Sequence, residues 1–98
     1  MPTYEPTEQF WRDYRKLTTA EQEAFRDAVE KFVEDLSNGR DFRKSLRVKP
    51  MRGTKGIFEM TWEGQDGRAT FQYGAPLSGD ENHIIWRRIG SHDIFTNP

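Results

Sequence analysis

The sequence predicts an α+β domain in which an N-terminal helix hairpin packs on a small antiparallel sheet. Two kinds of hydrophobic periodicity indicate this fold class. Apolar residues recur at helical spacing through residues 10–36, whereas they alternate with polar residues in the second half of the chain. A length of 98 residues suits one domain, expected to span residues 1–98. Because only 34% of the residues are hydrophobic but 13% are aromatic, a few large rings are expected to fill the core.

Two amphipathic segments predict the helix hairpin, and a short edge strand is expected before them at residues 4–6. The first helix starts near Thr7 and carries Phe10, Trp11, Tyr14 and Leu17. The second starts with Thr18-Thr19-Ala20-Glu21, a capping box in which hydroxyl and carboxylate satisfy free backbone donors reciprocally. It ends at Asn38-Gly39, where glycine adopts the left-handed conformation at low cost. Its apolar stripe consists of Phe25, Ala28, Val29, Phe32, Val33 and Leu36.

Period-two alternation predicts three strands, over residues 57–62, 68–73 and 83–89. Their apolar faces are expected to pack on the helix hairpin, because each surface needs the other to leave water. The predicted core is therefore Phe25, Val29, Phe32, Val33, Leu36, Phe58, Met60, Phe71 and Tyr73. The same alternation places Glu59, Arg68, Thr70 and Gln72 together on the opposite face. A face that combines a carboxylate with a guanidinium is a candidate site for chemistry.

The charge distribution is more informative than the net charge of −1. Residues 1–39 carry nine acidic and five basic side chains, whereas residues 40–55 carry seven basic side chains against Asp41 alone. Such a cluster attracts phosphates, although a solvated loop paired with the acidic helix before it would have the same composition. Both interpretations stay open on composition alone.

Several classes of protein are disfavoured by what the sequence lacks. Without cysteine it can form neither a disulfide nor a zinc site with thiolate ligands, and its two histidines are a poor metal site. No apolar run approaches the roughly 20 residues of a membrane span. The first residues do not resemble a signal peptide, so a cytoplasmic location is expected. No cofactor, metal or membrane partner is expected.

Three segments, in this order, resemble toxins of the RelE/ParE superfamily from type II toxin–antitoxin systems. They are KPMRGTKGIFE at 49–59, GRATFQY at 67–73 and RIGSHDIF at 88–95. The last is most similar to the YafQ-type branch, and the Gly-Ile-Phe-Glu stretch also resembles HigB-type members. The resemblance covers essentially the whole chain in element order and implies a βααβββ fold.

The resemblance implies an endoribonuclease that binds a cognate antitoxin and cuts messenger RNA on the ribosome. Cleavage by the RNA's own 2′-hydroxyl needs a base, an acid and a cation against the phosphorane charge. The residues that match these roles are Glu59 as base, His92 as acid and Arg68 as cation. Lys49, Arg52, Lys55 and Arg88 would hold phosphates. Phe95 lies where many members carry tyrosine, and it can stack on a base but cannot transfer a proton.

Simpler interpretations accompany each of these residues. Arg68 could pair with Glu59 as an ordinary ion pair on the sheet, His92 could be solvated near the chain end, and His83 is expected at the surface. Trp62 and Trp86 are expected in the core. Two other functions fit the same scaffold: a ParE-like gyrase inhibitor that is no nuclease, and a non-catalytic domain that binds an antitoxin. Codon preference, the antitoxin's identity and the oligomeric state do not follow from the sequence.

Overall fold

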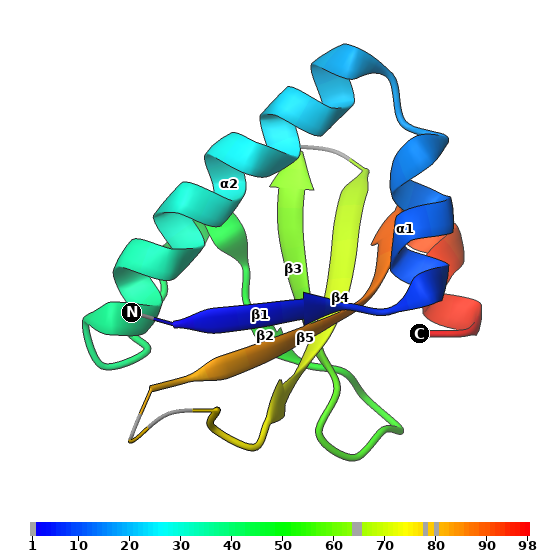
Figure 1. Ribbon diagram of the computed structural model, residues 1–98. Helices are drawn as coiled ribbons and strands as arrows, with labels where there is room; N and C mark the ends of the chain where they lie inside the picture. The colour runs from blue at the N-terminus through cyan, green and yellow to red at the C-terminus, as the bar shows by residue number, and fades with distance from the viewer. Residues whose placement is uncertain (1, 64–65, 78, 80) are drawn as a thin grey trace.

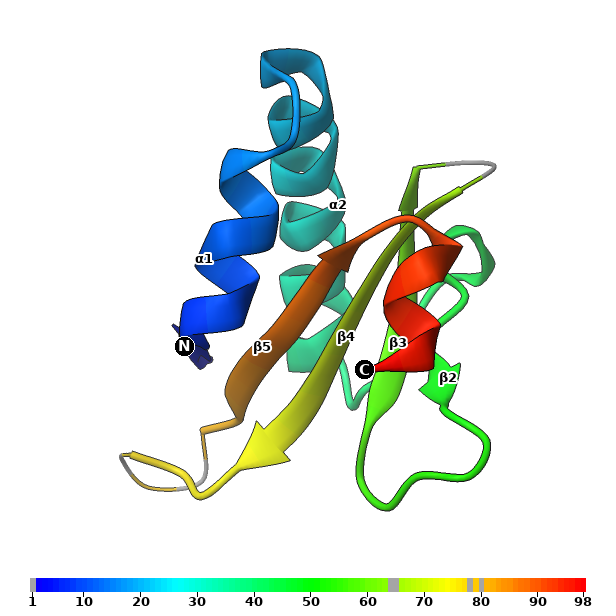
Figure 2. The same ribbon diagram turned by 90° about the vertical axis from the view of Figure 1, so that its right-hand side faces the viewer.

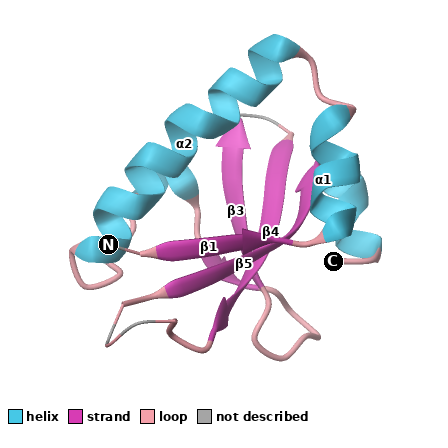
Figure 3. Ribbon diagram, in the orientation of Figure 1, coloured by secondary structure: helices cyan, strands magenta, loops and turns pink. Residues whose placement is uncertain are grey.

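The computed structural model describes residues 2–63, 66–77, 79 and 81–98, which form two helices and a five-stranded sheet (Figure 1). The strands are β1 (Thr3–Pro6), β2 (Lys49–Pro50), β3 (Phe58–Glu63), β4 (Gly67–Gly74) and β5 (His83–Gly90). The helices are α1 (Glu8–Arg15) and α2 (Thr19–Ser37). Two short 3₁₀ helices complete the chain, η1 (Lys44–Leu46) and η2 (His92–Thr96), and Figure 3 distinguishes helices from strands by colour.

The sheet has the strand order β1-β5-β4-β3-β2. The sequence predicted an antiparallel sheet, whereas the observed sheet is mixed. Strands β2 to β5 form an antiparallel meander, whereas β1 pairs in parallel with β5 and places Thr3 opposite His83. His83 is correspondingly buried, with 4% of its surface exposed, and the expectation that it lies at the surface is wrong. Its ring nitrogens contact Thr3 Oγ1 at 2.7 Å and Glu5 Oε1 at 3.3 Å, so burial leaves neither nitrogen unsatisfied.

Both helices begin where the sequence predicts. Thr7 caps α1 by accepting a hydrogen bond from the Phe10 amide, and Leu17 lies beyond the end of this helix. Thr18 and Glu21 form the predicted capping box of α2, with hydrogen bonds of 3.1 and 2.8 Å. Gly39 follows α2 with φ of 78°, the left-handed conformation expected of it.

The core lies between the helices and one face of the sheet, and large rings dominate it. The Phe32 ring has its centroid 5.0 Å from those of Phe42 and Phe71 and 5.3 Å from that of Trp86. Trp62 and Trp86 are buried, as predicted. Of the predicted core, Phe25, Phe32, Leu36, Met60 and Phe71 are buried, while Val29, Val33, Phe58 and Tyr73 are partly buried against it. The prediction omitted Phe10, Leu46, Ile84 and Ile89, which are also buried in it.

The other face of the sheet is covered in part by η2 (Figure 2). Thr70, which points away from the helices, is fully buried there, and its hydroxyl donates to the Pro98 carbonyl at 3.3 Å. Ile94 of η2 is also buried, at 5% exposure. The chain after β5 therefore folds back over the polar face of the sheet, and the candidate site lies beside it.

Candidate active site

A pocket of about 290 Å³ opens on the polar face of the sheet. Its lining consists of Arg47, Lys49, Glu59, Thr61, Arg68, His92 and Phe95. The three residues predicted to carry the chemistry all belong to it, together with two of the five predicted to hold RNA. These side chains come from β2, β3, β4 and η2, with Arg47 from the residue after η1, so the pocket exists only in the folded protein.

Strands β3 and β4 place the carboxylate and the guanidinium. Thr61 pairs with Arg68 across the ladder, and Glu59 lies two residues before Thr61, on the same face. Arg68 has only 7% of its surface exposed, and its Nη1 donates to the Gly67 carbonyl at 3.0 Å. The Trp62 indole donates to the Arg68 carbonyl at 2.9 Å, which ties the backbone of this arginine to the core. The guanidinium is thus held in a largely buried position at the pocket wall.

The 3₁₀ helix η2 brings the imidazole to the same place. Gly90 lies opposite Arg68 in the ladder, and His92 follows two residues later. The chain turns after Gly90, so that His92 and Phe95 of η2 both line the pocket. Their rings meet edge to face with centroids 5.7 Å apart. Arg68 and His92 therefore line one pocket.

Asp66 orients the imidazole. Its Oδ1 lies 2.5 Å from His92 Nδ1 and also accepts a hydrogen bond from the His92 amide at 3.3 Å. The side-chain hydrogen bond from His92 lowers the pKa of Asp66 below its ordinary value, and the amide adds to this effect. A carboxylate at Nδ1 fixes the orientation of the ring and leaves Nε2 as the nitrogen for a substrate.

The predicted phosphate-binding residues do not all share the pocket. Lys49 lines it and lies 3.7 Å from Glu59, so the ion pair of Glu59 is with Lys49. Arg52 and Lys55 are exposed in the loop between β2 and β3, outside the pocket lining. Arg88 lies elsewhere, with its Nε 2.7 Å from a carboxylate oxygen of Asp13 in α1.

Sequence reasoning missed Asp66, Arg47 and Thr61 as site residues. Asp66 stands in a turn and is 26 positions from its histidine partner, so no local pattern reveals the pair. Arg47 was counted in the basic segment, but its left-handed backbone, with φ of 48°, was not foreseen. A non-glycine residue in this conformation is uncommon, and such residues cluster at functional sites. Period-two alternation could have placed Thr61 at the site, because it lies next to the core residue Met60 in β3 and therefore faces the side of the sheet that carries Glu59.

The described part of the chain offers no group of three or more His, Asp or Glu side chains that could hold a metal ion. The pocket instead gathers arginine and lysine cations and an imidazole beside one carboxylate. Planar guanidinium groups suit phosphate oxygens, and an imidazole suits proton transfer near neutral pH. This donor set can bind a phosphodiester and move a proton to or from it.

Solved structures with the same fold are toxins and toxin–antitoxin complexes. YafQ from E. coli strain BL21(DE3) superposes with a TM-score of 0.62 over 95% of this chain and 96% of that chain, at 15% identity. The intact E. coli RelBE toxin–antitoxin complex contains a chain with a TM-score of 0.59 over 93% and 96%, at 16% identity. The YoeB/ParE toxin from Agrobacterium tumefaciens scores 0.57 over 92% and 98%, at 19% identity. The chain has the RelE/ParE toxin fold.

At the level of sequence, no family model and no curated protein matches the chain. The RelE/ParE toxin fold, an α+β arrangement of two helices on a mixed sheet, is therefore recognised through three-dimensional structure. Within the described ranges, no helix is long and apolar enough to cross a membrane.

Proposed function

We propose that this chain is the toxin of a toxin–antitoxin pair and that it cuts messenger RNA on the ribosome. The observation that carries the proposal is the pocket, in which a buried arginine, an oriented histidine and a carboxylate surround a space of about 290 Å³. The RelE/ParE toxin fold supports it, because the matched proteins are named as toxins. A cognate antitoxin is the proposed partner, since one matched structure is the intact RelBE toxin–antitoxin complex.

The proposed reaction uses the RNA's own 2′-hydroxyl. Glu59 accepts the proton of this hydroxyl, and the 2′-oxygen attacks phosphorus to form a 2′,3′-cyclic phosphate. The bond from phosphorus to the 5′-oxygen breaks, and His92 gives that oxygen a proton from Nε2. Arg68 stabilises the charge that develops on the phosphoryl oxygens, as a preorganised donor in a largely buried site. The chemistry balances without a metal or a cofactor.

Three further interactions support these roles. The Asp66 carboxylate contacts Nδ1 and so orients the His92 ring, which leaves Nε2 for the leaving oxygen. Lys49 Nζ lies 3.7 Å from Glu59 Oε1 and adds a cation to the pocket for a phosphate oxygen. Phe95 offers a face on which an RNA base can stack, a contact worth about 1–3 kcal/mol in other proteins. Arg52 and Lys55 hold RNA phosphates outside the pocket.

The test is cleavage of a reporter messenger by purified protein in a translating extract, with the cut ends mapped and their phosphates identified. We expect Arg68→Ala and His92→Ala each to lower cleavage by about 10²- to 10⁴-fold, because each removes a transition-state interaction. Arg26→Ala on the exposed face of α2 is the matched control and should cleave normally. Circular dichroism shows whether each variant is folded. Full activity in both site variants would refute the assignment.

A second candidate is inhibition of gyrase, because one matched structure is called a YoeB/ParE toxin. Supercoiling by purified gyrase, with and without the protein, separates this function from RNA cleavage. Loss of supercoiling with an uncut messenger would favour the gyrase inhibitor. A protein inactive in both assays would instead favour a non-catalytic antitoxin-binding domain.

A further inference from the structure

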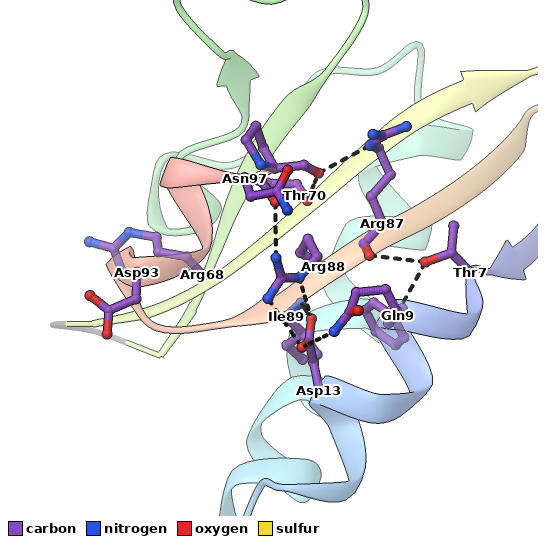
Figure 4. A network of polar contacts seen from close by, with 12 residues as sticks. Thr7, Gln9, Asp13, Arg68, Thr70, Arg87, Arg88, Ile89, Asp93 and Asn97 are labelled. Carbon is purple, nitrogen blue, oxygen red and sulfur yellow. Dashed lines mark hydrogen bonds and ion pairs between the residues drawn. The ribbon is translucent and has the colours of Figure 1, made fainter.

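Two neighbouring arginines of β5 hold the last residues of the described chain (Figure 4). Arg87 Nε donates to the Pro98 carbonyl at 3.1 Å, and Thr70 donates to the same oxygen at 3.3 Å. Arg88 Nη1 donates to the Asn97 carbonyl at 2.9 Å. These contacts lie directly after η2 and fix its C-terminal end against the sheet.

A β-bulge explains why two consecutive residues can reach the same segment. Successive side chains in a regular strand point to opposite faces. Here Thr70 pairs with Arg88 while Phe71 pairs with Trp86, so Arg87 is an extra residue on β5. Such a bulge re-aims side chains and is common beside functional sites. It brings both guanidinium groups to the tail.

Arg88 connects this tail to the first helix. Its Nε and Nη2 donate to the two carboxylate oxygens of Asp13 at 2.7 and 3.3 Å. Asp13 has 6% of its surface exposed and also accepts hydrogen bonds from Gln9 and the Ile89 amide, at 3.0 and 3.2 Å. Burial alone would raise the pKa of Asp13, but the hydrogen bonds, that of Arg88 foremost, outweigh burial and lower it. The carboxylate is therefore charged at neutral pH and holds Arg88 in one orientation.

We propose that Asp13 and Arg88 are positioning residues that hold η2 in place and so set the location of His92 and Phe95 in the pocket. Five residues of 3₁₀ helix have little stability of their own, since their hydrogen-bond geometry is poor. Within η2 only Ile94 is buried. The contacts at the end of η2 therefore help to hold it on the sheet, together with Ile94 and the Asp66 contacts of His92 at its start. The consequence for catalysis rests on the proposed function, whereas the structural coupling does not.

The same contacts argue against Arg88 as a direct RNA ligand. Its Nε and both terminal nitrogens already donate, to Asp13 and to Asn97. Turning the guanidinium toward a phosphate would leave a buried carboxylate without its partner, which is strongly unfavourable. A positioning role for Arg88 instead keeps its hydrogen bonds to Asp13 and Asn97.

Two variants test the coupling without removing a pocket residue. Asp13→Asn removes the charge that orients Arg88, and Arg88→Lys keeps a cation beside Asp13 but lacks the planar fork needed to reach Asn97 as well. In both we expect faster hydrogen exchange at the Ile94 and Asn97 amides, whose hydrogen bonds close η2. We also expect a shift of the His92 imidazole signals in NMR, because its contact with Asp66 loosens. Val29→Ala is the control for lost stability, since Val29 lies on α2 and packs against the core.

Kinetics on the ribosome test the consequence. We expect kcat to fall about 10- to 100-fold with KM changed less than about twofold, because misplaced groups lose transition-state stabilisation and not substrate binding. Unchanged exchange at Ile94 and Asn97 in both variants would overturn the proposal whatever the activity. Tighter RNA binding by Asp13→Asn with unchanged kcat would also overturn it and assign Arg88 to RNA contact. If the unaltered protein cuts no messenger, the proposed function fails, and exchange and NMR still decide the coupling.

Discussion

Asp35 determines how the chain leaves its long helix. It lies near the end of α2, and its two carboxylate oxygens accept hydrogen bonds from the Arg43 amide, Nε and Nη2 at 2.8–2.9 Å. The side-chain hydrogen bonds from Arg43 come first among the causes that lower the pKa of Asp35 to about 2. One side chain thereby anchors the segment that leads to η1 and to Arg47 at the pocket.

This pKa predicts how stability depends on pH. A carboxyl group with a depressed pKa stabilises the folded state above its unfolded pKa of about 4, and the stabilisation is lost as the pH falls through the folded value. We therefore expect the melting temperature to drop between about pH 4 and pH 2, and we expect Asp35→Asn to have a shallower drop over that range. Thermal melts of both proteins at half-unit pH steps measure the difference. Parallel profiles would mean that Arg43 does not hold this carboxylate.

At the scale of elements, patterns within a few neighbouring residues were sufficient to predict the helices and the strand faces, but not the pairing of strands that lie far apart in the sequence. The capping box at Thr18 and the alternation of β3 and β4 lie within a few residues, so the sequence predicted both helices and the shared face of Glu59 and Arg68. The parallel pairing of β1 with β5 joins residues about 80 positions apart, and nothing in either segment specifies its partner or direction. The Asp66–His92 contact was unpredictable for the same reason.

The β1 strand depends on a buried histidine. His83 contacts Thr3 and Glu5 through its two ring nitrogens, and its Cδ2 lies 2.8 Å from where a Cβ on Gly74 would be. We expect His83→Ala to cost about 1–3 kcal/mol of unfolding free energy, because Thr3 loses its partner and the ring leaves a space. Hydrogen exchange should accelerate at the Thr3 and Thr7 amides, which donate to Asn82 and Trp86. Equal hydrogen exchange in the unaltered protein and in His83→Ala would show that β1 is held by its backbone hydrogen bonds alone.

Across the whole molecule, charge is divided unevenly along the chain. The segment that contains both helices carries nine acidic and five basic residues, whereas residues 40–55 carry a net charge of +6, and Arg47 and Lys49 of that segment line the pocket. The net charge of −1 conceals this asymmetry. Because exposed charges farther apart than about 8–10 Å are screened at physiological salt, we expect any RNA near the pocket to respond to the local cations and not to the total charge.

The local cations predict a salt dependence of RNA binding. Each phosphate contact releases counterions, so replacing Lys49, Arg52 and Lys55 with glutamine should weaken binding and flatten the slope of log affinity against log salt by about 2. The matched control replaces Arg15, Arg26 and Lys31, three exposed cations of the helices, and changes the net charge equally. Fluorescence anisotropy with a labelled single-stranded RNA, over a series of salt concentrations, measures the affinity and the salt slope of each triple variant. If the two triple variants have the same slope, the RNA does not bind at the basic segment, and the total charge alone accounts for its affinity.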